Sequence, residues 1–347
     1  MSKKIISTIG PSSYNSDILN KLKSAGSDFF RINLSHTSSE ILKEQIDYLS
    51  IAGLPLIVDT EGSQIRTGNL KDIHFKENDF IKIYDSKITC DKHNLSLTPN
   101  NILKNLSNGC EIHLAFGSAK FIVKDTSNLS NEGYIICQVI HGGLVGSRKA
   151  VHISKINFGL PDFSEKDLTA VRFAKDMGIK YFTLSFMECA ESVMKIRKIH
   201  PGAIIYSKIE SKKGLDNLEE IMSVSDGILI DRGDLSSDIP IQKIPFVQKY
   251  IIEKCRAKGI EVFVATDTLQ NMFDSLRPNA ADANDMVNTL IDGATGIALT
   301  KETAVGRHPV STVKMLRRIM SQVEKLDSHE INSQQNFIHR LIEDETL

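Results

Sequence analysis

Short apolar runs and segments of helical spacing alternate over most of the chain. Before residue 60 the pattern predicts strands and helices in turn, at Ile5–Ile9, Asp17–Ala25, Phe29–Asn33, Glu40–Ile51 and Leu56–Asp59. After Gly159 the rhythm resumes with a helix from Ser164 to Met177 and strands at Tyr181–Leu184, Ile204–Ser207, Gly227–Ile230, Val262–Ala265 and Gly296–Leu299. A last helix is predicted from Pro309 to about Leu326, before a polar tail at 343–347.

The segment between these two halves has a different pattern. Alternating runs such as Phe80–Tyr84 and Tyr134–Val139 are separated by Asn-Gly, Asp-Ser and Gly-Gly turns. This predicts a small antiparallel β domain inserted after the third strand. We expect a barrel domain of residues 1–68 and 157–347 and an inserted, barrel-like β domain of residues 69–156.

Three strands before the insertion and five after it are the number that a closed (β/α)8 TIM barrel requires. Polar residues follow the strands, as in Thr8-Ile9-Gly10-Pro11, Ser207-Lys208-Ile209-Glu210 and Arg232-Gly233-Asp234. An open doubly wound sheet is the competing α/β fold, but it would not need polar chemistry at every strand end. The pattern therefore favours the barrel.

Composition narrows the classes of function. The 347 residues are 41% hydrophobic and 24% charged, with a formal net charge of −1, which does not favour a nucleic acid partner. The five cysteines form no Cys-x-x-Cys pair, as is typical of reduced intracellular thiols. No apolar run suits a signal peptide or a membrane span, so we expect a cytoplasmic protein without a membrane partner.

Lys208 and Glu210 are two residues apart, so on an extended strand both point the same way. Asp234 follows the next predicted strand, and adjacent strands lie about 5 Å apart. Glu210 and Asp234 are therefore candidates to share Mg²⁺ or Mn²⁺; a buried Lys–Glu ion pair is the alternative. Amides around Gly233 and Asp234 would suit a carboxylate or phosphate, although the glycine alone is explained by a turn.

A second cluster follows the predicted strands at 29–33 and 56–59. Arg31 is a candidate for phosphate, with Arg66 as a second. A monovalent cation would suit the oxygens of Asn33, Ser35, Asp59 and Thr60. The chain has no P-loop motif and no G-x-G-x-x-G after a strand, so phosphoryl transfer would rest on metal ions and basic side chains.

These motifs together resemble the pyruvate kinase family from Lys4 to about Met320. The matching strings include Thr8-Ile9-Gly10-Pro11, Arg31-Ile32-Asn33-Leu34-Ser35-His36, Ile65-Arg66-Thr67-Gly68, Ser207-Lys208-Ile209-Glu210, Arg232-Gly233-Asp234-Leu235 and Glu302-Thr303-Ala304-Val305-Gly306. The resemblance implies a (β/α)8 barrel with a β lid domain. It also implies the glycolytic transfer of phosphate from phosphoenolpyruvate to ADP, which gives ATP and pyruvate through a metal-stabilised enolate.

The resemblance also implies residue roles. Glu210 and Asp234 would hold Mg²⁺, and Lys208 would stabilise charge on the phosphoryl group. Thr266 would lie beside the enolate carbon and help a water to protonate it. The other implied roles are substrate binding by Gly233, Asp234, Thr266 and Ser185, phosphate binding by Arg31, nucleotide binding by His36, Arg66 and Lys149, and K⁺ binding by Asn33, Ser35, Asp59 and Thr60.

Several residues depart from the family pattern near the predicted site. Four carboxylates and a lysine stand where the family has other residues, namely Glu61, Glu188, Asp231, Asp267 and Lys301. New charges there should alter which substrate groups are accepted. The family's carboxyl-terminal allosteric domain, which carries much of its tetramer interface, is expected to be absent.

Two other functions remain open at this stage. A diverged relative could use the same metal–enolate site on another phosphoenolpyruvate-type or 2-oxo-acid substrate, for aldol chemistry, decarboxylation or transfer to another acceptor. A non-catalytic regulatory protein is the third reading. The sequence also leaves open whether the chain forms a homo-oligomer.

Overall fold

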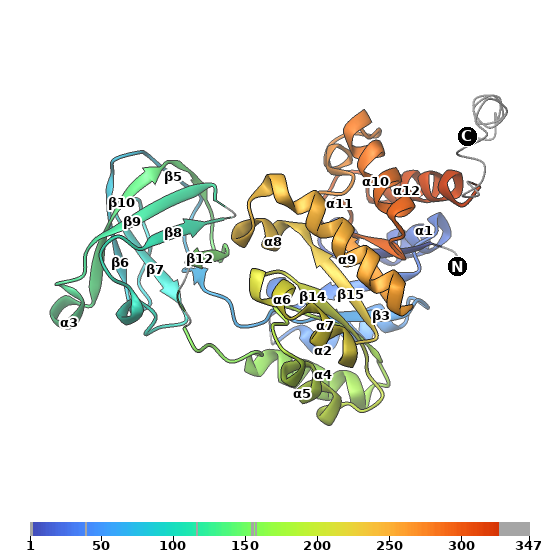
Figure 1. The fold of residues 1–347 in the computed structure, drawn as a ribbon, viewed down its shortest axis with the longest axis horizontal. Coiled ribbons are helices and arrows are strands. Elements are labelled where there is room, and N and C mark those ends of the chain that lie inside the picture. The colour runs from blue at the N-terminus through green and yellow to red at the C-terminus, as the bar shows by residue number, and fades with distance from the viewer. Residues whose placement is uncertain (1–2, 39, 116, 154–155, 157, 326–347) are drawn as a thin grey trace. The chain divides into compact units, whose positions relative to one another are not determined.

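The computed structural model describes residues 3–38, 40–115, 117–153, 156 and 158–325 (Figure 1). The chain divides into two compact units. The first comprises the described parts of 1–61, 165–232 and 243–347, and the second those of 62–164 with 233–242. Among the described helices, none combines the length and apolar character that a bilayer crossing requires.

A closed barrel of parallel strands forms the first unit. Its strands are β1 (Lys4–Thr8), β2 (Phe29–Asn33), β3 (Leu56–Asp59), β13 (Tyr181–Leu184), β14 (Ile204–Ile209), β15 (Gly227–Asp231), β16 (Glu261–Ala265) and β17 (Gly296–Leu299). They close in the order β1-β17-β16-β15-β14-β13-β3-β2, and every neighbouring pair is parallel. The predicted (β/α)8 fold is confirmed.

Helices follow the strands along the chain. They are α1 (Ser16–Ala25), η1 (Leu34–His36), α2 (Leu42–Ser50), α4 (Glu165–Asp176), α5 (Ala190–Ile199), α6 (Lys212–Asp216), α7 (Leu218–Val224), α8 (Arg232–Asp238), η3 (Ile241–Lys243), α9 (Ile244–Lys258), η4 (Gln270–Phe273), α10 (Ala280–Asp292), α11 (Lys301–Ala304) and α12 (Pro309–Glu324). Asn15 caps α1, since its side chain accepts from the Asp17 amide, and Gly26 ends it at a φ of 109°. The predicted helix end at Leu326 and the polar tail lie outside the described residues.

The barrel interior is filled by residues from the strands themselves. One buried cluster draws on seven of the eight strands and consists of Ile6, Phe29, Ile57, Tyr206, Leu229, Phe263, Ala265 and Ala298. Side chains on a strand alternate between its two faces, so residues two positions further along point inward as well. This alternation decides which polar residues reach the end of the barrel.

Gly296, at the start of β17, allows two strands to approach closely. A Cβ atom there would lie 2.1 Å from the Lys4 carbonyl oxygen and 2.7 Å from Cε1 of Phe263. We therefore expect Gly296→Ala to lower the free energy of unfolding by about 2–3 kcal/mol, as overpacking of a core does. Urea unfolding would measure it, with Gly202→Ala as the matched control, because a Cβ there meets nothing closer than 3.7 Å. Equal effects of the two substitutions would contradict the packing explanation.

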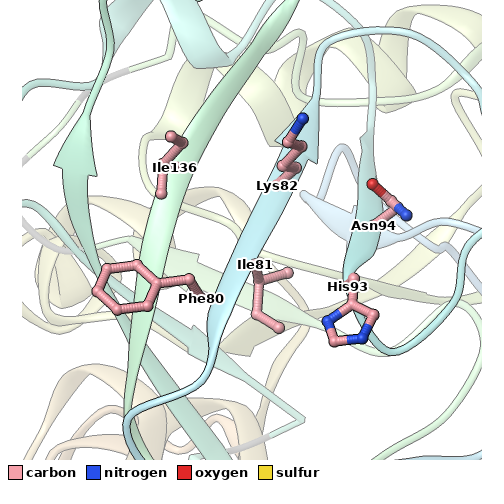
Figure 2. A pocket seen from close by; sticks show the side chains of 6 residues that line it. All are labelled: Phe80, Ile81, Lys82, His93, Asn94 and Ile136. Carbon is pink, nitrogen blue, oxygen red and sulfur yellow. The ribbon is translucent and has the colours of Figure 1, made fainter.

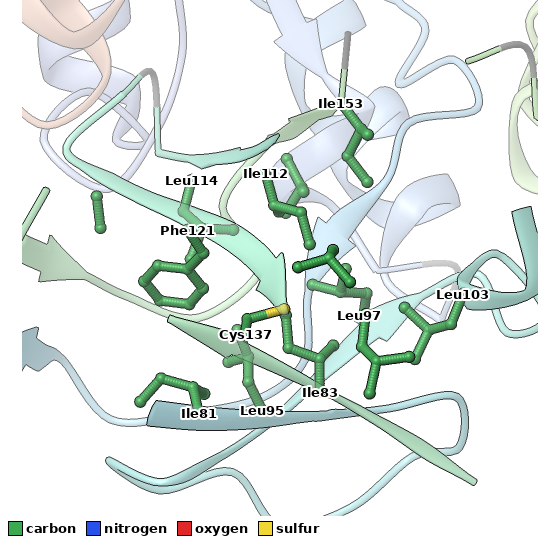
Figure 3. Close-up of a cluster of buried hydrophobic side chains, with 14 of the residues drawn as sticks. Ile81, Ile83, Leu95, Leu97, Leu103, Ile112, Leu114, Phe121, Cys137 and Ile153 are labelled. Atoms are coloured by element: carbon green, nitrogen blue, oxygen red, sulfur yellow. The ribbon is translucent and has the colours of Figure 1, made fainter. Parts of the chain in front are cut away.

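The second unit is a β structure with its own core. Besides most of α8 and η3, its elements are β4 (Arg66–Thr67), β5 (Ile73–Phe75), β6 (Phe80–Tyr84), β7 (Asn94–Thr98), η2 (Leu103–Asn105), β8 (Glu111–Leu114), β9 (Ala119–Asp125), α3 (Leu129–Glu132), β10 (Tyr134–His141), β11 (Gly143–Val145) and β12 (Val151–Ile153). Alternate residues such as Ile81, Ile83, Leu95 and Leu97 are buried together (Figure 3). Its strand pairs are antiparallel as predicted, with one exception. β6 and β7 run parallel, because the connection 85–93 leads from the end of β6 back to the level of its first residues, where β7 begins.

Candidate active site

Polar side chains continue the inward face of the barrel strands. Lys208 and Glu210 lie two and four residues after the core residue Tyr206, and Asp231 lies two residues after Leu229. Arg31 and Asp59 follow core residues in the same way on β2 and β3. The alternation that fills the barrel thus delivers these charges to its carboxyl end, where TIM barrels place their active sites.

Lys208 is at the centre of the group. Its Nζ lies 2.8 Å from Oε1 of Glu210, 3.5 Å from Oδ1 of Asp59 and 3.7 Å from Oδ2 of Asp231. It also donates a hydrogen bond of 3.1 Å to Oγ of Ser185. Only 6% of the lysine side chain is exposed, so the ammonium is held by protein groups rather than by water.

Burial and charge oppose each other in the titration of this group. Burial lowers the pKa of Lys208, but Asp59, Glu210 and Asp231 together outweigh it and raise that pKa above its ordinary value. Burial raises the pKa of Glu210 to about 7, opposed by Lys208 and assisted by Asp231. The lysine therefore stays protonated, and added positive charge would favour the ionised form of Glu210.

Arg31 has hydrogen-bonding capacity to spare. The residue is 3% exposed, and its Nη2 lies 3.8 Å from Oδ2 of Asp59. Its Nε and Nη1 are buried and form no hydrogen bond with any residue that the structure describes. Buried donors without an acceptor cost free energy, and a bound anion would remove that cost.

Asp59 and Ser185 are fixed by their neighbours. Oδ1 of Asp59 accepts a hydrogen bond of 2.6 Å from the Thr183 hydroxyl. The Ser185 hydroxyl donates to the Thr60 carbonyl oxygen at 2.6 Å, and the Ser185 amide donates to Oγ1 of Thr60 at 2.9 Å. Ser185 is thus oriented to accept the hydrogen bond from Lys208, and its predicted contact with substrate stays a prediction.

Three carboxylates gather beside Lys208. One oxygen from each of Glu210, Asp231 and Asp234 lies within 4.8 Å of the others. The sequence predicted Glu210 and Asp234 as a metal pair, and the structure brings their oxygens together. It missed Asp231. Carboxylate oxygens alone are a donor set that suits Mg²⁺ or Mn²⁺, so these residues fit the metal that the motifs implied.

Thr266 follows β16 in a strained conformation, with a φ of 69°. Its hydroxyl donates a hydrogen bond of 2.7 Å to Oδ1 of Asp231. Its carbonyl oxygen accepts from Nε and Nη2 of Arg232 at 3.0 and 2.9 Å, and Arg232 is held in turn by Asp285 at 2.7 Å. Asp231 therefore fixes the direction of the hydroxyl, and Arg232 holds the backbone of the same residue.

Comparison with known proteins now decides the family. The family model described as pyruvate kinase, barrel domain, matches residues 1–313. The chain belongs to the pyruvate kinase family. It is 32% identical over 333 residues to the pyruvate kinases of Staphylococcus aureus strain MRSA252 and Staphylococcus epidermidis strain RP62A. The match covers 92% of this chain but 57% of each relative, so the chain spans a little over half of their length.

The residues suggested for K⁺ lie at and just after the ends of β2 and β3, two adjacent strands of this pyruvate kinase barrel. Asn33 on β2 is in register with Asp59 on β3. Ser35 lies beyond the strand in the short helix η1, because the Asn33 side chain accepts a hydrogen bond of 2.9 Å from the Ser35 amide and turns the backbone. K⁺ binding by the oxygens of these residues and of Thr60 remains a prediction.

The predicted nucleotide residues are divided between the units. His36 is exposed in η1 of the first unit. Arg66 and Lys149 belong to the second unit, where Nη1 of Arg66 donates to the Arg148 carbonyl oxygen at 3.0 Å and the Thr67 amide donates to that of Lys149 at 2.9 Å. Arg66 and Lys149 thus lie on neighbouring segments of the second unit.

The carboxylates that depart from the pyruvate kinase pattern have different surroundings. Glu61 pairs with Lys166. Glu188 lies 3.0 Å from Nζ of Lys213, and Asp267 lies 2.9 Å from Nζ of Lys301. Asp231 instead faces Lys208 and Thr266, two residues to which the motifs assign chemistry.

A pocket of about 190 Å³ lies in the second unit (Figure 2). It is lined by Phe80, Ile81, Lys82, His93, Asn94 and Ile136. None of the predicted site residues is among them. The pocket therefore adds nothing to the site in the barrel.

Proposed function

We propose that the chain transfers the phosphoryl group of phosphoenolpyruvate to ADP, giving ATP and the enolate of pyruvate, which is then protonated at carbon. The supporting observation is the buried Lys208 between carboxylates, together with two buried donors of Arg31 that have no partner among the described residues. This is a site with countercharge for a phosphate and oxygens for a cation. Phosphoryl transfer needs such positioning and countercharge more than covalent chemistry.

Each basic group has a separate role in this proposal. Arg31 binds the phosphate through Nε and Nη1, which have no other partner in the described structure. Lys208 offsets the negative charge that develops as the phosphoryl group leaves the enolate oxygen, and Ser185 holds it in place. Glu210 and Asp234 hold Mg²⁺ or Mn²⁺, which supplies countercharge to the substrate oxygens. Asn33, Ser35, Asp59 and Thr60 hold K⁺.

Protonation of the enolate is assigned to Thr266. Its hydroxyl has a fixed direction because it donates a hydrogen bond to Asp231. A water held by Thr266 delivers the proton to carbon, and the amides of Gly233 and Asp234 in the first turn of α8 bind the substrate carboxylate. His36, Arg66 and Lys149 bind the phosphates of the nucleotide.

A second candidate is enolate chemistry without a nucleotide, on another 2-oxo acid. The observation in its favour is Asp231, a third carboxylate beside the group that would stabilise an enolate. A purely regulatory role is disfavoured, because burying Lys208 among acidic groups costs stability that apolar residues would not.

The test is turnover of the full chain with phosphoenolpyruvate, ADP, Mg²⁺ and K⁺, with pyruvate and ATP both measured. We expect pyruvate and ATP in equal amounts, and loss of turnover to background when a chelator removes the divalent ion. Restoring Mg²⁺ should restore the rate.

Two results would redirect the proposal. Exchange of solvent deuterium into pyruvate without ATP formation would favour the second candidate. Neither turnover nor exchange, in a protein whose circular dichroism shows a folded α/β domain, would exclude both enzymatic functions.

A further inference from the structure

We propose that Asp231 is a third carboxylate ligand of the divalent cation, so that this chain binds the ion before substrate arrives. The inference rests on the proposed function for the identity of the site. It goes further, because the motifs assign the ion to Glu210 and Asp234 alone. The family pattern has a small residue at position 231.

The placement of Asp231 singles it out among the four carboxylates that depart from the family. Glu61, Glu188 and Asp267 are each paired with a lysine outside the predicted site residues. Asp231 is 6% exposed and is the last residue of β15, on the inward face two residues beyond Leu229. Its carboxylate therefore faces the same space as those of its neighbours in the group.

The two oxygens of Asp231 have distinct surroundings. Oδ1 accepts the hydrogen bond from Thr266. Oδ2 lies 3.7 Å from Nζ of Lys208, which is beyond the reach of a direct hydrogen bond of about 3.2 Å at most. The Thr266 contact thus orients the carboxylate through Oδ1, while Oδ2 lies on the side of Lys208.

The charges of the site support a divalent ion. Two basic groups of the site are Lys208 and Arg31. The carboxylates around them are four, namely Asp59, Glu210, Asp231 and Asp234. When all are ionised, the negative charge exceeds the positive by two, which is the charge of one such cation. Without Asp231 the excess would be one.

An independent sign of a ligand comes from Arg31. Its buried Nε and Nη1 have no acceptor in the described structure and call for an anion next to Asp59. Mg²⁺ is commonly held by one or two carboxylates together with substrate phosphate oxygens. A third carboxylate supplies a ligand oxygen that the substrate would otherwise provide, so the ion can stay bound when no substrate is present.

The experiment is a titration of the substrate-free full chain with Mn²⁺, followed by electron paramagnetic resonance. We expect Asp231→Asn and Asp231→Ala each to raise the dissociation constant about 10- to 100-fold. The alanine variant keeps the test decisive if the asparagine variant does not fold, since a small residue fits here in the family.

Two matched variants complete the test. Asp267→Asn removes a carboxylate from the residue after Thr266 and should leave Mn²⁺ affinity unchanged, because Lys301 is its partner. Thr266→Val removes the hydrogen bond that orients Asp231 but keeps the carboxylate, so it should raise the dissociation constant less than Asp231→Asn does.

Unchanged Mn²⁺ affinity in folded Asp231 variants would overturn the inference. So would a loss in Thr266→Val as large as that in Asp231→Asn. Either result can occur in a protein that still forms pyruvate, in which case the proposed function stands. Tight Mn²⁺ binding that depends on Asp231, in a protein that forms no pyruvate, would support the inference and reject the function.

Discussion

Replacing Lys208 by methionine should lower the rate of pyruvate formation by about 10² to 10³ and the free energy of unfolding by about 3–5 kcal/mol. The rate falls because the buried ammonium no longer offsets charge on the departing phosphoryl group. Stability falls because the carboxylates of Asp59, Glu210 and Asp231 keep their burial but lose their shared counterion.

The stability loss should depend on pH. In the folded protein burial raises the pKa of Glu210 to about 7, well above its unfolded value, so its ionised form is the destabilising one. This destabilisation is present above pH 7 and is lost as the pH falls toward the unfolded value. Without Lys208, which opposes the rise, the effect should be larger, so the deficit of Lys208→Met should shrink between about pH 8 and about pH 5 in metal-free buffer.

Urea unfolding at several pH values would measure this effect. Lys213→Met is the matched control, because that lysine side chain is 61% exposed beside Glu188 and its loss should cost no more than about 0.5 kcal/mol. If the stability deficit of Lys208→Met grew as the pH fell, Glu210 would not be the acid whose ionised form destabilises the folded protein.

The barrel was predictable because its strands are apolar on both faces. Runs such as Phe29–Asn33, Leu56–Asp59 and Gly296–Leu299 are strands with the predicted bounds. The predicted ends of β14 and β15 were too early, at Ser207 and Ile230. In the sequence a charged residue marks the end of an apolar run. Inside a barrel the strand can continue through that residue when oppositely charged side chains of other strands pair with it.

Asp231 shows the limit of motif-based prediction. The string Arg232-Gly233-Asp234 drew attention to Asp234, although Leu229 and Asp231 share the strand period that also predicts Lys208 and Glu210. Applying the same period to β15 would have found it. The pairing of Glu61 with Lys166 could not be found in this way, since it joins residues 105 positions apart through the fold.

Arg31→Met should separate activity from stability. We expect pyruvate formation to fall by about 10² to 10³, because the phosphate loses its buried partner. The free energy of unfolding should change by no more than about 1 kcal/mol. Loss of the Asp59 pair is offset by removal of two buried donors that have no acceptor in the described structure, and Asp59 keeps Lys208 as a partner. Steady-state kinetics and urea unfolding would measure the two effects.

Arg197 provides the opposite case. Its Nε, Nη1 and Nη2 donate to the Val224 and Ala203 carbonyl oxygens and to Asp226, at 3.0, 3.1 and 2.7 Å. Arg197→Met should therefore lose about 1–3 kcal/mol of stability with little change in turnover. If Arg31→Met proved as destabilising as Arg197→Met and kept full activity, Arg31 would be a structural ion pair with Asp59. Arg197, whose donors are all hydrogen-bonded, stabilises the fold. Arg31, whose buried Nε and Nη1 have no acceptor among the described residues, is positioned to bind a ligand.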